Sequence, residues 1–355
     1  MSQHSTAKEK NRIEYLDALR GFTMVLVVLT HIAGFNLGVN TGDSNNFHYY
    51  FCQVRMPLFF FVSGFVFYKN NFVWNWTSIK NFLQKKFFVQ IISPFIFLLF
   101  YINYKNIPFI NAITDEFKAG YWFTFTLFFF FILYIVLKAS IDKTKIKENT
   151  ALTIILFIGF ITHFIWVKGY LAKLEIPYSL LSALSMNQIT YFIFFTLGIC
   201  IKRHFNKFER LLDKSYLVVI AIALFFTINM FVDTTNLRPL ISRIINLILS
   251  TSGIVITFAV FRKNEKFFAS NNKIANTLKF IGKRTLDIYL LHFFYLSCTN
   301  LKDVFPFFAE HNLPLLEFTI SLIIATIVIT ASLFTSSILR ADCTLAHYLF
   351  GAKKK

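Results

Sequence analysis

The chain has 355 residues, of which 56% are apolar and only 15% are charged, and its mean hydropathy is +0.57. A soluble domain carries about 25% charged residues. A chain this apolar lacks the polar groups that cover a water-exposed surface, which excludes a water-soluble enzyme. The net charge of +18 would indicate nucleic acid in a soluble protein. Here the basic residues lie in short runs between apolar segments, so we expect membrane lipids as partners and no nucleic acid.

Ten apolar runs follow one another along the chain, near 15–38, 49–68, 87–104, 121–138, 150–168, 188–201, 216–232, 244–262, 285–299 and 314–339. About 20 helical residues cross the hydrocarbon core of a bilayer, whereas barrel strands give shorter, alternating segments. The runs therefore predict an all-α fold, a polytopic membrane helical bundle of about ten transmembrane helices. We expect a cytoplasmic N-terminal tail over 1–14, a membrane domain over 15–340 and a basic cytoplasmic C-terminal tail over 341–355.

The basic residues give an orientation for this bundle. If both termini are cytoplasmic, 27 of the 36 lysines and arginines fall in cytoplasmic segments and 7 in outer loops. The other two, Arg20 and Arg55, lie inside apolar runs. This bias follows the positive-inside rule and predicts a multi-pass protein of the cytoplasmic (inner) membrane with both termini cytoplasmic.

The first run carries three ionisable residues, Asp17, Arg20 and His31. Ionisable groups inside a bilayer are costly and are candidates for function. Arg20 and His31 are eleven residues apart, which is about three helical turns and a rise of about 16 Å along one face. Asp17 and Arg20 have the i,i+3 spacing of a helical ion pair. Arg20 could also simply extend to the membrane surface, whereas His31 lies too deep for that. His31 can act as a general base, and its alternative role is a structural hydrogen bond between helices, which is the usual one for a lone histidine.

Further polar residues lie in the second, fifth and ninth runs. Arg55 is a buried guanidinium that needs an anion or carbonyl partner, and the nearby Ser63-Gly64 pair permits close helix packing. In the ninth run we expect Thr285 to cap a helix that carries Asp287, Tyr289 and His292. His163 in the fifth run is interpreted as a structural, hydrogen-bonded histidine. The four cysteines are far apart and show no metal-ligand spacing, so we expect no metal.

Four segments together resemble the integral-membrane acyltransferase-3 family, which includes O-acetyltransferases of cell-surface glycans. They are RIEYLDALRGFTMVLVVLTHIAGF, RMPLFFFVSGF, GYWFTFTLFFF and IGKRTLDIYLLHFF, and the resemblance extends over about 12–350. It implies transfer of an acyl group, usually acetyl from acetyl-CoA, to a sugar hydroxyl of a glycan or glycolipid acceptor. The family's Arg and His of the first span match Arg20 and His31, its buried Arg of the second span matches Arg55, and its late-span His matches His292.

The positions of these residues suggest a hypothesis for the layout of the reaction. Lys85, Lys86, Lys283 and Arg284 would bind the phosphates of acyl-CoA, with Arg20 deeper and held by Asp17. His31 would act as general base, and Arg55 or another donor would stabilise the oxyanion, while Ser63, Tyr289 and His292 would bind substrate or support the site. Many members carry an Arg-x-x-Arg pair before a proline at the third span. This chain has Lys85, Lys86 and Gln90 before Pro94, which keeps positive charge but loses the bidentate guanidinium fork.

Two other classes of function compete with the enzyme. One is a transporter of an acylated or carboxylated small molecule, with Arg55 as its anion site and His31 as a proton relay. No inverted repeat is apparent in the sequence to support it. The other is a purely structural membrane partner, which leaves the intramembrane charges without a role. The sequence leaves open the acceptor, the acyl length, and the choice between direct transfer and a covalent acyl-enzyme intermediate.

Overall fold

The computed structural model describes residues 13–39, 46–69, 74–164, 176–232, 237–298, 301 and 313–352, and this part of the chain contains helices but no strand. In chain order the elements are α1 (Glu14–His31), η1 (Ile32–Asn36), α2 (Phe47–Phe67), α3 (Trp76–Phe87), η2 (Phe88–Ile92), α4 (Ser93–Tyr104), α5 (Phe109–Thr114), η3 (Lys118–Gly120), α6 (Trp122–Asp142), α7 (Glu148–Phe164), α9 (Tyr178–Ala183), η5 (Ile189–Tyr191), α10 (Phe192–Arg203), α11 (Phe205–Leu212), α12 (Ser215–Phe231), α13 (Pro239–Lys263), α14 (Glu265–Ala269), α15 (Lys273–Lys283), α16 (Thr285–Leu296), α18 (Pro314–Leu339) and α19 (Cys343–Phe350).

Every predicted apolar run overlaps one of these helices, which confirms an all-α polytopic bundle. Within the described residues, six helical segments are long and apolar enough to cross a membrane: Tyr15–Asn36, Phe47–Phe67, Trp76–Tyr104, Trp122–Asp142, Pro239–Lys263 and Pro314–Leu339. α11 and α12, bent by 77° relative to each other, would form a seventh span if they are counted together. α7 and α16 are apolar but shorter. The number of about ten and the cytoplasmic location of both termini stay predictions.

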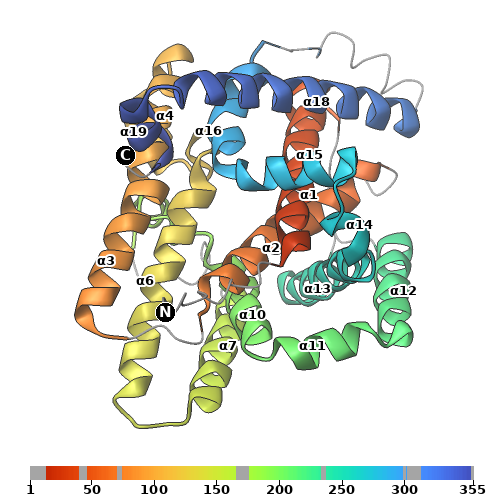
Figure 1. Cartoon of the computed structure of the whole chain (residues 1–355). Helices are drawn as coiled ribbons and strands as arrows, with labels where there is room; N and C mark the ends of the chain where they lie inside the picture. The colour runs from red at the N-terminus through yellow and green to blue at the C-terminus, as the bar shows by residue number, and fades with distance from the viewer. Residues whose placement is uncertain are drawn as a thin grey trace, which may run out of the picture.

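α1 joins two hydrophobic clusters and is the central helix of the bundle (Figure 1). Its first half contributes Tyr15, Ala18 and Leu19 to a cluster with α2, α6, α10 and α13. Its second half packs with α4, α16 and α18 in the other cluster. Arg20, Thr30 and His31 lie on the side of α1 that faces the cavity.

Glycines allow two pairs of helices to touch backbone to backbone. A Cβ atom on Gly64 of α2 would overlap the carbonyl of Phe195, and one on Gly198 of α10 would overlap the carbonyl of Phe61. The same reciprocal arrangement joins α1 and α15 at Gly21 and Gly282. The prediction that Gly64 lies at a close helix contact is confirmed, and the partner of α2 is α10.

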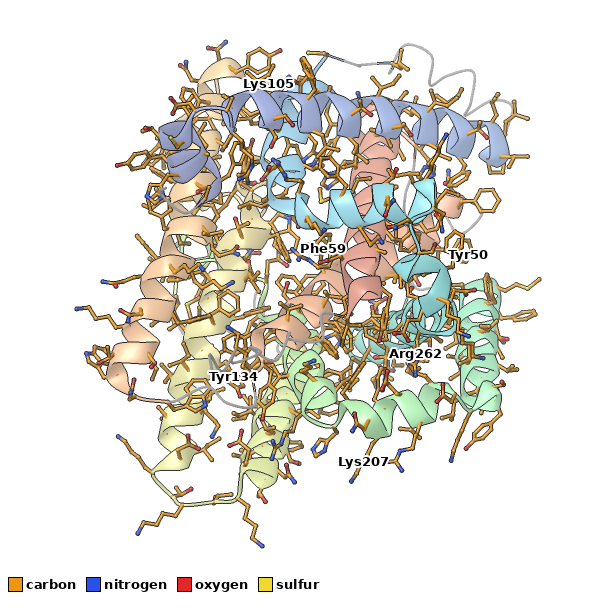
Figure 2. All side chains as sticks on the ribbon, in the orientation of Figure 1. Tyr50, Phe59, Lys105, Tyr134, Lys207 and Arg262 are labelled. Carbon is orange, nitrogen blue, oxygen red and sulfur yellow. The ribbon has the colours of Figure 1, made fainter. Side chains whose placement is uncertain are left out.

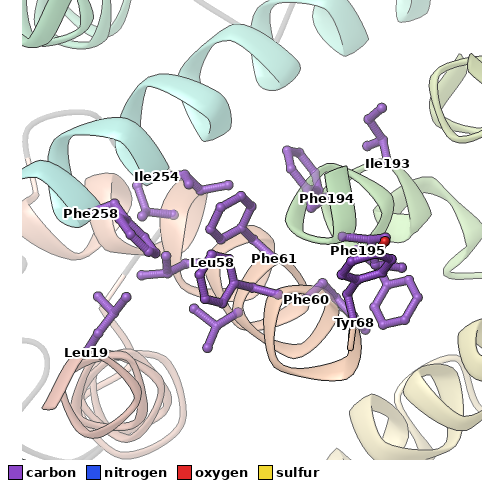
Figure 3. Packing of buried hydrophobic residues seen from close by; sticks show 14 of the residues in the cluster. Leu19, Leu58, Phe60, Phe61, Tyr68, Ile193, Phe194, Phe195, Ile254 and Phe258 are labelled. Atoms are coloured by element: carbon purple, nitrogen blue, oxygen red, sulfur yellow. The ribbon is translucent and has the colours of Figure 1, made fainter. Parts of the chain in front are cut away.

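The packing around α2 is almost entirely apolar and largely aromatic. Figure 3 shows Phe60 and Phe61 of α2 near Phe194 and Phe195 of α10, with Phe258 of α13 on the other side. Lys207 projects outward from α11 (Figure 2). The numerous phenylalanines of this chain therefore include core residues as well as exposed ones such as Phe100 and Phe231.

The third span begins earlier than the sequence indicates. Its helical segment starts at Trp76, whereas the apolar run was predicted from 87, because α3 is an amphipathic extension of the same rod. Between α3 and α4 the backbone widens into the π-helical segment η2, and a second π-helical segment, η1, directly follows His31. Such segments are rare and often lie at functional sites.

Candidate active site

A cavity of about 1220 Å³ lies among α1, α2, α3, α4, α6 and α16. Six of the eleven predicted site residues line its wall: Arg20, His31, Arg55, Ser63, Lys86 and Tyr289. The other five do not line it: Asp17, Lys85, Lys283, Arg284 and His292. A pocket for a drug-sized ligand holds about 300–1,000 Å³. This cavity is therefore large enough for two substrates together.

Two histidines meet at the wall of the cavity. His31 Nδ1 of α1 lies 3.1 Å from His292 Nε2 of α16, and the two rings are parallel to within 6° with centroids 5.3 Å apart. His292 is fully buried, whereas His31 is partly exposed and lines the cavity. Two residues 261 positions apart thus form a hydrogen-bonded pair, which no spacing in the sequence could indicate.

The hydrogen bonds of His292 fix the proton positions in this pair. Its Nδ1 lies 2.9 Å from the backbone oxygens of both Ile288 and Tyr289, and a carbonyl can only accept. Nδ1 therefore carries the proton, so Nε2 of the neutral ring presents a lone pair. His31 Nδ1–H donates to that lone pair. The remaining lone pair of His31, on Nε2, is left available toward the cavity.

Arg55 supplies a positive charge beside this pair. Its Nη1 donates to Thr30 Oγ1, the residue just before His31, while its Nε is buried and has no hydrogen-bond partner. It lies close enough to act electrostatically on both imidazoles. Within the described residues Arg55 makes no ion pair. A guanidinium in this situation has donors available for an anion that enters the cavity.

Tyr289 is fixed by the loop that precedes α6. Its hydroxyl donates to the Gly120 carbonyl at 3.0 Å and accepts from the Phe123 backbone N–H at 3.2 Å. The loop has positive φ at three consecutive residues: Lys118, Ala119 and Gly120. Gly120 also has no room for a side chain, because a Cβ would overlap the Phe293 ring. Tyr289 is therefore held as part of the wall.

One end of the cavity is basic, and we call it the basic end. It is lined by Arg20, Lys69 and Lys86, and both Arg20 and Lys69 act electrostatically on the Lys86 ammonium. Arg20 Nη1 lies 4.0 Å from Asp17 Oδ1, which places the two groups in the expected i,i+3 ion pair at its outer limit. Arg20 Nη2 also donates to Thr285 Oγ1 at 3.1 Å. Grouped like charges of this kind favour a polyanionic ligand.

Three of the residues expected to bind the donor lie elsewhere. Lys85 and Lys283 are exposed and do not line the cavity. Arg284 Nη1 donates instead to Asp287 Oδ2 at 3.1 Å, and Asp287, which is 1% exposed, also binds Arg340 through two contacts of 2.7 Å. This ion cluster joins α16 to α18. The donor-binding role of Lys85, Lys283 and Arg284 stays a prediction.

The expected helix cap at Thr285 was wrong. The N-cap of α16 is Arg284, and the Thr285 hydroxyl accepts from Arg20 in place of capping the helix. The reason is that α15 leads into α16 with no intervening loop, so Thr285 already has helical geometry. His163 lies away from the cavity with its ring nitrogens 2.9 Å from the Thr190 carbonyl and 3.2 Å from the Arg243 carbonyl, as expected for a structural residue.

Sequence reasoning did not select several polar residues of the cavity. Thr30, Lys69 and Gln90 line it, and so do four residues near the ends of α1 and α4 or in the loop before α6, which we call the far end: Asn36, Lys105, Asp115 and Phe117. Helical spacing offered a signal for Gln90, which lies four residues after Lys86, about one turn along the same face. Lys69 lies beyond the last residue of α2 and has no such signal. Of the far-end residues, Lys105, Asp115 and Phe117 lie between helices, where periodicity gives no signal, and Asn36 is the last residue of η1.

The fold and the site define a class of protein: a polytopic helical membrane protein that encloses a cavity with a histidine pair and an arginine in its wall. The acyltransferase domain profile of the acyltransferase-3 family matches residues 13–334, which is nearly the whole chain. The chain belongs to this family and is a membrane acyltransferase. Comparisons with curated proteins and with solved structures found no significant match.

Proposed function

We propose that the protein is an O-acetyltransferase of the cytoplasmic (inner) membrane, which moves acetyl from acetyl-CoA to a hydroxyl of a surface polysaccharide or lipid-linked sugar. The observation that carries this proposal is the hydrogen-bonded pair of His31 and His292, which leaves the His31 Nε2 lone pair toward a cavity with a basic end. Acetyl-CoA acts as co-substrate, and no metal takes part.

His31 is the general base. Its Nε2 accepts the proton of the acceptor hydroxyl as the oxygen attacks the thioester carbonyl. His292 holds the tautomer that makes this possible, since its own Nδ1 proton is committed to two carbonyls. When the C–S bond of the tetrahedral intermediate breaks, the proton on His31 passes to the departing CoA thiolate.

Arg55 stabilises the oxyanion that forms on the thioester carbonyl. Its guanidinium donates to Thr30, the residue before His31, and lines the same cavity as His31, and its Nε has no hydrogen-bond partner and so can donate to the oxyanion. Fixed donors aimed at developing charge in a site shielded from water make one of the largest contributions to catalysis, of about 10²–10³ in kcat per donor.

The dimensions of the cavity support a CoA thioester as donor. Along α1, His31 lies about 16 Å beyond Arg20. In the pantetheine arm, thirteen bonds separate the sulfur from the nearest phosphorus, and at about 1.25 Å per bond the extended arm measures about 16 Å. Phosphates bound at Arg20 and Lys86 would therefore place the thioester beside His31.

The far end of the cavity suits the acceptor. It offers an amide, an ammonium and a carboxylate from Asn36, Lys105 and Asp115, together with the ring of Phe117. Sugars need hydrogen-bond partners for their hydroxyls and flat apolar surfaces for their C–H faces. Donor and acceptor would thus approach the histidines from opposite ends of one cavity.

The test uses purified protein in nanodiscs with acetyl-CoA labelled in the acetyl group and a glycan and lipid fraction from the source membrane. Label on a glycan or glycolipid supports the proposal, and His31→Ala should lower kcat by about 10²–10⁴. His163→Gln is the matched control, because it also removes an interior imidazole, but one whose ring nitrogens contact backbone carbonyls and which does not line the cavity. It should keep activity. Uptake of labelled substrate into vesicles without acylation would contradict the proposed acetyltransferase activity and would favour a transporter.

A further inference from the structure

Gln90 is a buried amide in the cavity wall that no protein group satisfies. It belongs to η2, is 9% exposed, and lines the cavity on the same side of the helix as Lys86. Its Oε1 has no hydrogen-bond partner. A buried polar atom without a partner costs about 1–3 kcal/mol, so native proteins seldom keep one without a reason.

The backbone of η2 directs this side chain into the cavity. Phe82, Lys86 and Gln90 succeed one another at intervals of four residues, and all three line the wall. The π-helical geometry of Phe88–Ile92 widens the helix at this point and changes the rotation of the residues that follow. Gln90 is therefore a neutral polar group on the cavity wall, one turn further into the cavity than Lys86.

The chemistry of the Gln90 carboxamide indicates which chemical group of a ligand would bind to it. It presents one acceptor and two donors and carries no charge, so its best partner is another amide, which offers both an N–H and a C=O. A phosphate group would use only its N–H donors, and the Lys86 ammonium, one turn away, suits a phosphate better. A secondary amide in a largely apolar arm fits this position better.

The position of Gln90 along the cavity indicates which amide of the pantetheine arm it would contact. Arg20 and Lys86 both line the basic end of the cavity, which is where the donor's phosphates would bind. Gln90 lies about 6 Å beyond Lys86 along its own helix, and His31 lies about 16 Å beyond Arg20 along α1. An extended arm anchored at the basic end would therefore pass Gln90 about 10 Å before it reaches His31. In pantetheine, the carbonyl carbon of the amide between the β-alanyl and pantoyl units lies eight bonds from the sulfur, or about 10 Å.

We propose that Gln90 binds the β-alanyl–pantoyl amide of the donor's pantetheine arm and thereby selects a pantetheine thioester. The inference rests on the proposed function, since it requires a CoA thioester in the cavity. Gln90 occupies the region where an Arg-x-x-Arg pair is usual in the family, so an amide contact here replaces a guanidinium contact in this chain.

The experiment measures binding to the purified full-length protein by calorimetry, so that it needs no acceptor. The three probes are acetyl-CoA, S-acetylpantetheine, which lacks the phosphates, and S-acetyl-N-acetylcysteamine, which also lacks the β-alanyl–pantoyl amide. Gln90→Leu should weaken acetyl-CoA and S-acetylpantetheine alike, by about 5- to 100-fold, because an amide is left unpaired. It should leave S-acetyl-N-acetylcysteamine unchanged.

Gln84→Leu is the matched control, because Gln84 is exposed on α3 and does not line the cavity. It should change none of the three affinities. The thermal midpoint of Gln90→Leu should not fall, since the change removes an unpaired buried oxygen. If wild type binds acetyl-CoA and Gln90→Leu binds it equally well, the role of Gln90 is wrong while the proposed function stands. If wild type binds none of the probes, the proposed function itself fails.

Discussion

Replacing His292 by Phe tests whether this residue sets the tautomer of His31. The variant keeps a flat ring of similar size beside Phe293 but removes the acceptor of the His31 Nδ1–H, now 3.1 Å away. The buried N–H would then lack a partner in the reactive tautomer, at a cost of about 1–3 kcal/mol. Since each 1.36 kcal/mol is a factor of ten in rate, kcat should fall by about 5- to 150-fold.

His292→Gln separates this role from simple packing. A Gln carbonyl can accept from the His31 Nδ1–H, so the Gln variant should recover most of the activity that the Phe variant loses. The assay is steady-state transfer of labelled acetyl, with KM for acetyl-CoA expected to stay within a few-fold in both variants. Nitrogen NMR of labelled histidine gives a second readout, because His31 should show a protonated Nδ1 in wild type and a tautomer mixture in His292→Phe. Wild-type kcat in a folded His292→Phe protein, or an equal loss in both variants, would refute the reasoning.

Three further predictions concern charge, packing and pH. Arg55→Met should lower kcat by about 10²–10³ with little change in KM for acetyl-CoA, and a pure KM effect would instead make Arg55 a substrate-binding residue. Gly64→Ala should lower the free energy of unfolding by about 1–3 kcal/mol, because its Cβ would overlap the Phe195 backbone, and an unchanged thermal midpoint would disprove that contact. Burial lowers the pKa of Lys118 from 10.5 to about 8, so the folded state binds fewer protons than the unfolded state between these values. Wild type should therefore gain stability relative to Lys118→Met as the pH rises from about 8 to 10, and a parallel pH dependence of the two midpoints would contradict this.

The sequence predicted the helices well because continuous apolar runs leave lipid as the only compatible solvent. It also selected His31, Arg55 and His292 correctly as interior polar residues, since ionisable groups are rare in such runs. It could not show that His31 and His292 touch, because their contact depends on how α1 and α16 pack. The predicted extents of the spans were less accurate where an amphipathic extension such as α3 continues a helix beyond its apolar part.

The basic residues illustrate a different limit. A lysine near a membrane surface has the same sequence signature whether it orients the chain, binds a ligand or joins two helices. Lys86 lines the cavity, Lys85 beside it is exposed, and Arg284 belongs to the ion cluster around Asp287. Only the direction of each side chain separates these roles, and that direction changes by 100° from one helical residue to the next.

The contact between Gly21 and Gly282 has a consequence for the histidines. Each glycine lies ten residues before a histidine of the pair, Gly21 before His31 and Gly282 before His292, and at this crossing the two chains touch with no side chain between them. This backbone contact sets the distance between α1 and α15, and so it also sets how α1 and α16 are placed around the cavity. A methyl group at Gly21 or Gly282 would push α1 and α15 apart and separate the two imidazoles. Activity would then fall although neither glycine contacts a substrate.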